Sequence, residues 1–379
     1  MRFLIKAGLF TVLFLVMMHL FGMNCFADTS IPEGIAETLH ETDLEIPSDT
    51  QDALSDFGVS VEEPESVLSL SPSDYLHHFT GTLKKELRAP FVLLFSLLSL
   101  TLLSSLLSGL GDTVSDSGMR RLVEMLCAIV CTAGAAKPLC TCLERTASTL
   151  ENGQAFMLSF IPVFSAFLAA GGHVASGATY QLFILFLTET VMQIANSFLF
   201  PLLQMSAAIG IADAIHPELR LGGFVSGFKK IITWTLGTFM ALFSALLSVR
   251  SFVAVSADSL ASKSVKLLSS SLIPIIGGAV SDAYGTVQGS IRLVRNGTGA
   301  AGILIILCMI MPALVSLILF RAIFAFSGVF AEIAGTKSLS ALFQNIQSVL
   351  SAAFALLICF SLMLIFSCAV MLLLTGGSN

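Results

Sequence analysis

Charged residues are scarce in this 379-residue chain, in which only 12% of the residues are Asp, Glu, Lys or Arg. Soluble domains carry about 25%, because water must solvate their surfaces. Hydrophobic residues make up 55% of the chain, and the mean hydropathy is +0.90. The net charge of −6 also lacks the basic excess that a nucleic-acid-binding surface requires. The composition therefore excludes a water-soluble protein, a disordered chain and a nucleic-acid binder, and it indicates an integral membrane protein.

Catalytic and cofactor-binding motifs are also missing from the sequence. No phosphate-binding P-loop occurs, so the chain does not hydrolyse a nucleotide by itself. The eight cysteines lack the paired spacing or neighbouring histidines of a zinc site, so we expect no metal and no cofactor. Residues 109–112 match the Gly-x-Gly-Asp signature of membrane aspartyl proteases, but no earlier helix supplies the second aspartate of the dyad. We therefore predict that the protein is not an enzyme.

Residues 1–27 have the three parts of a signal peptide. A start with two basic residues precedes an apolar stretch, and Ala27 ends a small-residue cleavage pattern. Two alternatives are an uncleaved first helix and a lipoprotein leader in which Cys25 is the acceptor. All three interpretations place residues 28–88 on the translocated side of the membrane.

Residues 28–88 form an acidic tail, in which 14 acidic and three basic residues give a formal charge of −11. Prolines and acidic residues at this density oppose a packed core. Near the end of the tail, Leu76, Phe79, Leu83 and Leu87 recur at helical spacing, which predicts an amphipathic helix. We expect this helix either to lie on the bilayer surface or to pack against protein.

Residues 89–379 consist of long apolar runs with short polar breaks, which predicts an all-α, polytopic membrane domain. A helix needs about 20 residues to cross about 30 Å of hydrocarbon. The basic residues beside these runs do not give one consistent orientation. About seven transmembrane helices are expected after the signal peptide, with six to nine allowed, at 90–110, 122–136, 155–172, 180–199, 231–249, 300–320 and 349–374.

A weak internal repeat interrupts the apolar runs. Residues 159–163 resemble residues 271–275, and a glycine pair follows each copy. Proline removes a hydrogen bond from a helix and bends it, and paired interruptions are typical of transporter sites. The alternative is chance, since Ser-x-Ile-Pro is a common combination in an apolar sequence. The candidate helix breaks are Pro162, Gly171, Gly172, Pro274, Gly277 and Gly278.

Glu189 is the most unusual polar residue, because it lies nine residues into an apolar run. Gln193 and Asn196 fall on the same helical face. A carboxylate at that depth is costly and normally faces a bundle interior or water. These residues are therefore either the lining of a pore or polar contacts that hold helices together. Glu124 has the same two interpretations but lies nearer the end of its run.

Three stretches of the membrane domain resemble the stage III sporulation protein AE family. They are Ser-Phe-Ile-Pro-Val at 159–163, the run from Gly237 to Val249, and Ile-Pro-Ile-Ile-Gly-Gly-Ala-Val-Ser-Asp-Ala at 273–283. The third stretch is the most specific, and the resemblance extends over roughly residues 70–379.

The resemblance implies a multi-pass channel or core scaffold subunit of a sporulation transport complex that is similar to a secretion apparatus. The complex would lie in the mother-cell membrane around the forespore. The implied partners are other stage III sporulation subunits, among them a separate ATPase, and a forespore-membrane protein across the intermembrane space. The resemblance does not decide whether the protein forms a homo-oligomer. The internal repeat and Glu189 also favour a second function, a self-sufficient secondary transporter.

Overall fold

The computed structural model describes residues 47–57, 72–113, 117–170, 174–216, 221–245 and 277–373. All the regular elements in these ranges are helices, which confirms the all-α prediction. The expected signal peptide, most of the acidic tail, and the candidate breaks Gly171, Gly172 and Pro274 lie outside the described residues.

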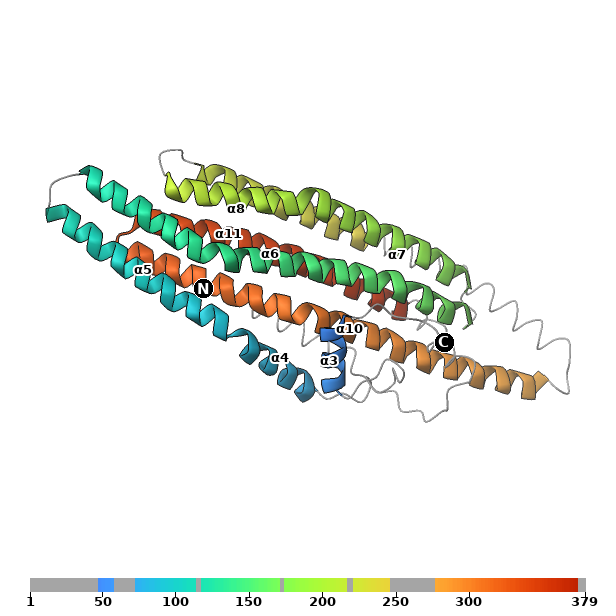
Figure 1. Ribbon diagram of the computed structural model, residues 1–379. Coiled ribbons are helices and arrows are strands. Elements are labelled where there is room, and N and C mark those ends of the chain that lie inside the picture. The colour runs from blue at the N-terminus through green and yellow to red at the C-terminus, as the bar shows by residue number, and fades with distance from the viewer. Residues whose placement is uncertain are drawn as a thin grey trace.

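Two short helices precede the bundle, α3 (Ser48–Asp56) and α4 (Pro72–Glu86). The Phe57 and His78 rings join them, with 4.8 Å between their centroids. Helix α4 continues almost directly into α5 (Arg88–Thr113) and also packs against α10 (Figure 1). Helix α4 is the amphipathic helix that the sequence predicts. Of the two expected placements, on the bilayer surface or against protein, the structure shows packing against protein.

The bundle consists of long helices that run side by side (Figure 1). After α5 come α6 (Ser117–Ala170), α7 (Val174–Ile194), the π-helix η2 (Ala195–Leu199), α8 (Phe200–Ile215), a helix over 222–245, α10 (Gly277–Ile333) and α11 (Lys337–Leu373).

Helix α6 contains two of the predicted transmembrane segments. The sequence predicts separate crossings at 122–136 and 155–172, but both runs lie on this one helix of 54 residues. Pro138 and Pro162 are inside it, so Pro162 does not break the helix. The charged residues between the two runs stay on its surface, where Arg145 donates to Glu86 of α4 at 2.9 Å. In the part of the chain that is described, five helical segments are long and apolar enough to span a membrane.

Helix α11 forms the centre of the bundle. It packs against α6, α8 and α10 and is mostly buried, because apolar residues cover nearly all of its faces. A tight turn joins it to α10. Gly335 adopts φ = +76° there, the Gly335 N–H donates to the Glu332 carbonyl, and the Thr336 N–H donates to the Ala331 carbonyl. This pattern is a Schellman cap, which glycine favours because it has no Cβ to clash in the left-handed region.

Helices α6 and α10 approach each other closely at Gly302. Phe156, Phe160 and Phe164 stack along α6, with centroid distances of 5.1 and 5.9 Å. Phe160 lies against Gly302 of α10, where an added Cβ would come within 2.5 Å of the ring. Glycine at 302 therefore sets how closely these two helices approach.

Candidate functional site

A polar strip lies on the outer face of α7, η2 and α8. We define it as Glu189, Gln193, Asn196 and Gln204, which are all exposed. The first three share the helical face that the sequence predicts, whereas Gln204 extends the strip beyond the π-helix and was not predicted. The strip does not face the interior of the bundle.

The strip is connected to α6 by hydrogen bonds. Gln154 Nε2 donates to Glu189 Oε1 at 2.8 Å. Two to three turns away, Ser165 Oγ donates a second α6–α7 hydrogen bond to Gln181 Oε1, also at 2.8 Å. Gln193 Nε2 donates to Ser197 Oγ of the same helix at 3.1 Å. Glu189 thus forms a hydrogen bond between α6 and α7, and its side chain is still exposed on the outer surface of the bundle.

The π-helix in the strip lies directly before Pro201. Pro201 has no N–H to donate, and its ring would clash with the carbonyl four residues earlier in a regular α-helix. The chain instead widens by one residue, so that the Phe200 N–H donates to the Ala195 carbonyl five positions back. Such single wide turns are frequent at functional sites. Asn196 and Ser197 lie in this turn.

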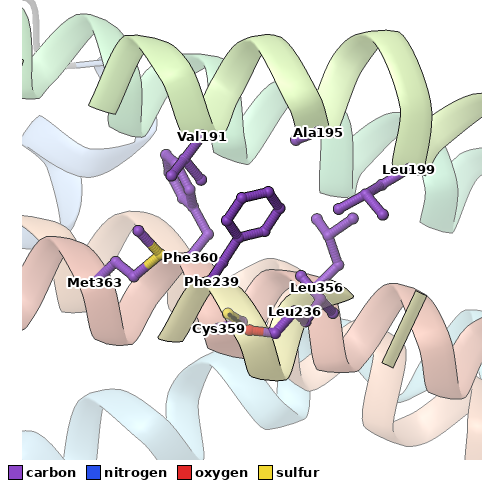
Figure 2. A pocket seen from close by; sticks show the side chains of 9 residues that line it. All are labelled: Val191, Ala195, Leu199, Leu236, Phe239, Leu356, Cys359, Phe360 and Met363. Carbon is purple, nitrogen blue, oxygen red and sulfur yellow. Dashed lines mark hydrogen bonds between the residues drawn. The ribbon is translucent and has the colours of Figure 1, made fainter. Parts of the chain in front are cut away.

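The opposite face of the same helices is apolar and packed. Val191, Ala195 and Leu199 approach Leu236 and Phe239 of the helix 222–245 (Figure 2). Leu356, Cys359, Phe360 and Met363 of α11 complete this cluster. The cavity among these side chains is about 10 Å³, which is at most the size of one water. No solute can bind there.

Exposed apolar residues continue the face that carries the polar strip. Leu182 is 73% exposed and Phe186 is 69% exposed, about two turns and one turn before Glu189 respectively. A soluble monomer would not leave such residues open to water in a contiguous patch. This face therefore borders lipid or another protein.

The remaining predicted site residues lie apart from the strip. Glu124 is on α6, within the first of its two apolar runs. Gly277 and Gly278 are the first two residues of α10. Among the described residues, no group of three or more potential metal-binding side chains occurs.

A second polar cluster was missed from the sequence. Asp213 at the end of α8 accepts hydrogen bonds from the Gly222 N–H at 2.9 Å and from Asn345 Nδ2 of α11 at 3.3 Å. Asn345 Nδ2 also donates to the Gly210 carbonyl at 3.0 Å. This Asp213 junction ties α8, the start of the next helix and α11 together. An acid near the end of an apolar run was the available signal, but its side-chain partner Asn345 lies 132 residues away in sequence.

Comparisons with known proteins agree on one family. The family model for stage III sporulation protein AE matches residues 57–375. The stage III sporulation protein AE of Bacillus subtilis (strain 168) is 24% identical over 241 residues, which cover 64% of this chain and 60% of that protein. The chain thus matches less than two thirds of that relative's length. No solved structure matches the chain.

Proposed function

Because the chain belongs to the stage III sporulation protein AE family, we propose that it is a channel or core scaffold subunit of a membrane complex that moves material between the mother cell and the forespore. It acts without catalysing a reaction and lies in the mother-cell membrane, with its N-terminal tail in the intermembrane space. Its partners are other stage III sporulation subunits, including a separate ATPase, and a forespore-membrane protein.

The observation that carries this proposal is the exposed position of the polar strip. A carboxylate facing hydrocarbon costs roughly 2.5–3.5 kcal/mol on insertion scales. The hydrogen bond from Gln154 satisfies only one side of Glu189, and Gln193 and Asn196 are exposed beside it. Water or a polar protein surface on the outer face removes most of that cost. The strip therefore suits a conduit or a contact between subunits.

The packed interior supports a conduit between chains rather than through one chain. A secondary transporter holds its solute near the bilayer midplane, between its repeats. In the described part of this bundle, the space between α7, the helix 222–245 and α11 has room for one water at most. The candidate break Pro162 also lies inside the continuous helix α6. These features favour a complex subunit over the self-sufficient transporter.

The proposal can be tested in sporulating cells that carry the chain as their sole copy. Glu189, Gln193 and Asn196 are replaced together by leucine, and the passage of a small fluorescent tracer between mother cell and forespore is measured. The triple variant should lose most of the transfer, beyond any reduction in its abundance that follows from losing the Gln154–Glu189 hydrogen bond. The matched control is Gln344→Leu, an exposed glutamine on α11 outside the strip, which should transfer normally. Full transfer by the triple variant would refute the proposal.

A further inference from the structure

Three exposed cations lie where α4 meets α5. Lys84 and Lys85 are in the last turn of α4, and Arg88 is the first residue of α5. Only Leu87 separates the two helices, and the Phe91 N–H donates to the Leu87 carbonyl at 3.2 Å, so helical hydrogen bonding resumes at once. The three cations therefore fall within about one helical turn of each other, and all of them are exposed. We call Lys84, Lys85 and Arg88 the basic turn.

The acidic residue inside the basic turn is already paired. Glu86 accepts a hydrogen bond from the Arg145 guanidinium of α6 at 2.9 Å. Glu144, next to Arg145, is exposed on α6. The four cations and two acids at this point give a net formal charge of +2. Among the described residues, none forms an ion pair with the basic turn, so its cations are free to bind an external anion.

An exposed apolar face begins directly after the basic turn. Val92, Phe95, Leu102 and Leu106 follow Arg88 at helical spacing along α5, and they are between 51% and 67% exposed. The opposite side of α5 packs against α6 and α10. The surface of α5 is therefore cationic at its first residue and apolar along the rest of the same face.

The length of this apolar segment matches a bilayer. Residues 89–111 contain no Asp, Glu, Lys or Arg. At 1.5 Å per residue, these residues extend about 34 Å, and the hydrocarbon layer is about 30 Å thick. When this segment lies in the hydrocarbon, the basic turn lies at the height of the lipid phosphate groups.

We propose that the basic turn binds the phosphate groups of anionic phospholipids and thereby sets the depth of α5 in the bilayer. The Arg88 guanidinium presents paired N–H donors that match two phosphate oxygens, and the two lysines add compact positive charges. A zwitterionic headgroup gains less from these cations, because it carries a cation of its own. The acyl chains of the bound lipid lie along the exposed face that begins at Val92.

A single Trp placed beside the basic turn provides the test. Trp234 is the only Trp in the chain, so Val92→Trp combined with Trp234→Phe gives one reporter. The full chain is placed in nanodiscs of phosphatidylcholine with a minor fraction of phosphatidylglycerol, and one of the two lipids carries brominated acyl chains that quench Trp fluorescence. Brominated phosphatidylglycerol should quench with at least about fivefold higher apparent affinity than brominated phosphatidylcholine, which corresponds to one cation at an anionic surface.

Replacing all three cations should abolish this preference. The variant carries Lys84→Gln, Lys85→Gln and Arg88→Gln, and its melting temperature should not change, because these side chains are exposed and form no ion pair. If the triple variant unfolds, Lys84→Gln combined with Lys85→Gln should still remove most of the preference. The matched control is Lys337→Gln, which removes an exposed lysine from the start of α11 and should keep it.

Three outcomes would overturn the proposal. Equal quenching by the two lipids would show that the basic turn does not select an anionic headgroup. A preference that persists in the folded variants without these cations would assign it to another part of the surface. Loss of the preference on adding inorganic phosphate at constant ionic strength would show that the basic turn takes free phosphate instead of lipid.

Discussion

At the scale of single residues, the position of Glu189 is compatible with both alternatives that the sequence left open. Its carboxylate accepts a hydrogen bond from Gln154 of α6, as an interhelical contact does. It is also exposed, as the lining of a conduit must be. A neutral amide can replace the first role but not the second, so the two roles separate in variants.

Glu189→Gln should therefore leave the protein intact and impair transport. The amide oxygen still accepts from Gln154, so the melting temperature of the purified chain and its abundance in cells should not change. Removal of the charge should reduce tracer passage into the forespore several-fold. Glu189→Leu also breaks the hydrogen bond, which should lower the free energy of unfolding by about 0.5–1.5 kcal/mol. Normal passage with Gln would assign Glu189 to helix contact alone.

Gly302 is a residue whose size matters more than its chemistry. Gly302→Ala places a Cβ within 2.5 Å of the Phe160 ring, and overpacking of this kind costs about 1–3 kcal/mol. Thermal unfolding of the purified chain should show this loss, and Phe160→Leu in the same chain should restore part of it. Gly227→Ala is the matched control, since its Cβ meets nothing within 4 Å and alanine favours the helix. An unchanged melting temperature for Gly302→Ala would contradict the close approach of α6 and α10.

At the scale of elements, helix type was predictable from the sequence and helix ends were not. Long apolar runs predict helices because the backbone must bond to itself in lipid, and the described runs are helical. The polar segment between 136 and 155 looks like a loop in a hydropathy profile. It remains helical because Arg145 pairs with Glu86 and its other charged side chains are exposed. The π-helix before Pro201 was unpredictable, because Pro138 and Pro162 lie within the α-helix α6.

The Asp213 junction sets how α8 turns into the next helix. Asp213→Ala removes the acceptor of both the Gly222 N–H and Asn345 Nδ2, and a partly buried donor left unpaired costs about 1–3 kcal/mol. The melting temperature of the purified chain should fall accordingly. Asp213→Asn should cost less, because its amide oxygen still accepts from Gly222. Equal stability of the alanine variant and the unchanged chain would show that the junction does not hold these helices.

At the scale of the whole molecule, the apolar surface is too long for one bilayer. Leu126 and Leu158 on α6 are 62% and 42% exposed, and the 32 residues between them span about 48 Å. A tilt of 40° would reduce this to about 37 Å, still more than the roughly 30 Å of hydrocarbon. Part of this surface must therefore be covered by protein, which is consistent with a subunit of a larger assembly.

The whole-molecule features also show the limits of sequence reasoning. Composition predicts a polytopic helical protein, and the stretch at 273–283 resembles the family that the comparisons identify. Which face of α7 carries Glu189, Gln193 and Asn196 was predictable from helical spacing. That this face points outward was not, because it depends on how α7 packs against α6 and how α8 packs against α11, and the second of these contacts joins segments far apart in sequence.

The most direct test of the account is the solvent accessibility of the polar strip in the assembled complex. Gln193→Cys is introduced where Cys127 and Cys140 are serines, and sporulating cells are treated with a small, charged thiol reagent. The account predicts rapid modification of residue 193 and, with a bulky reagent, loss of tracer passage. Phe186→Cys, on the same face but in the apolar part, should react slowly. If residue 193 resists the reagent as fully as residue 186 does, the strip borders no water and the proposed conduit is wrong.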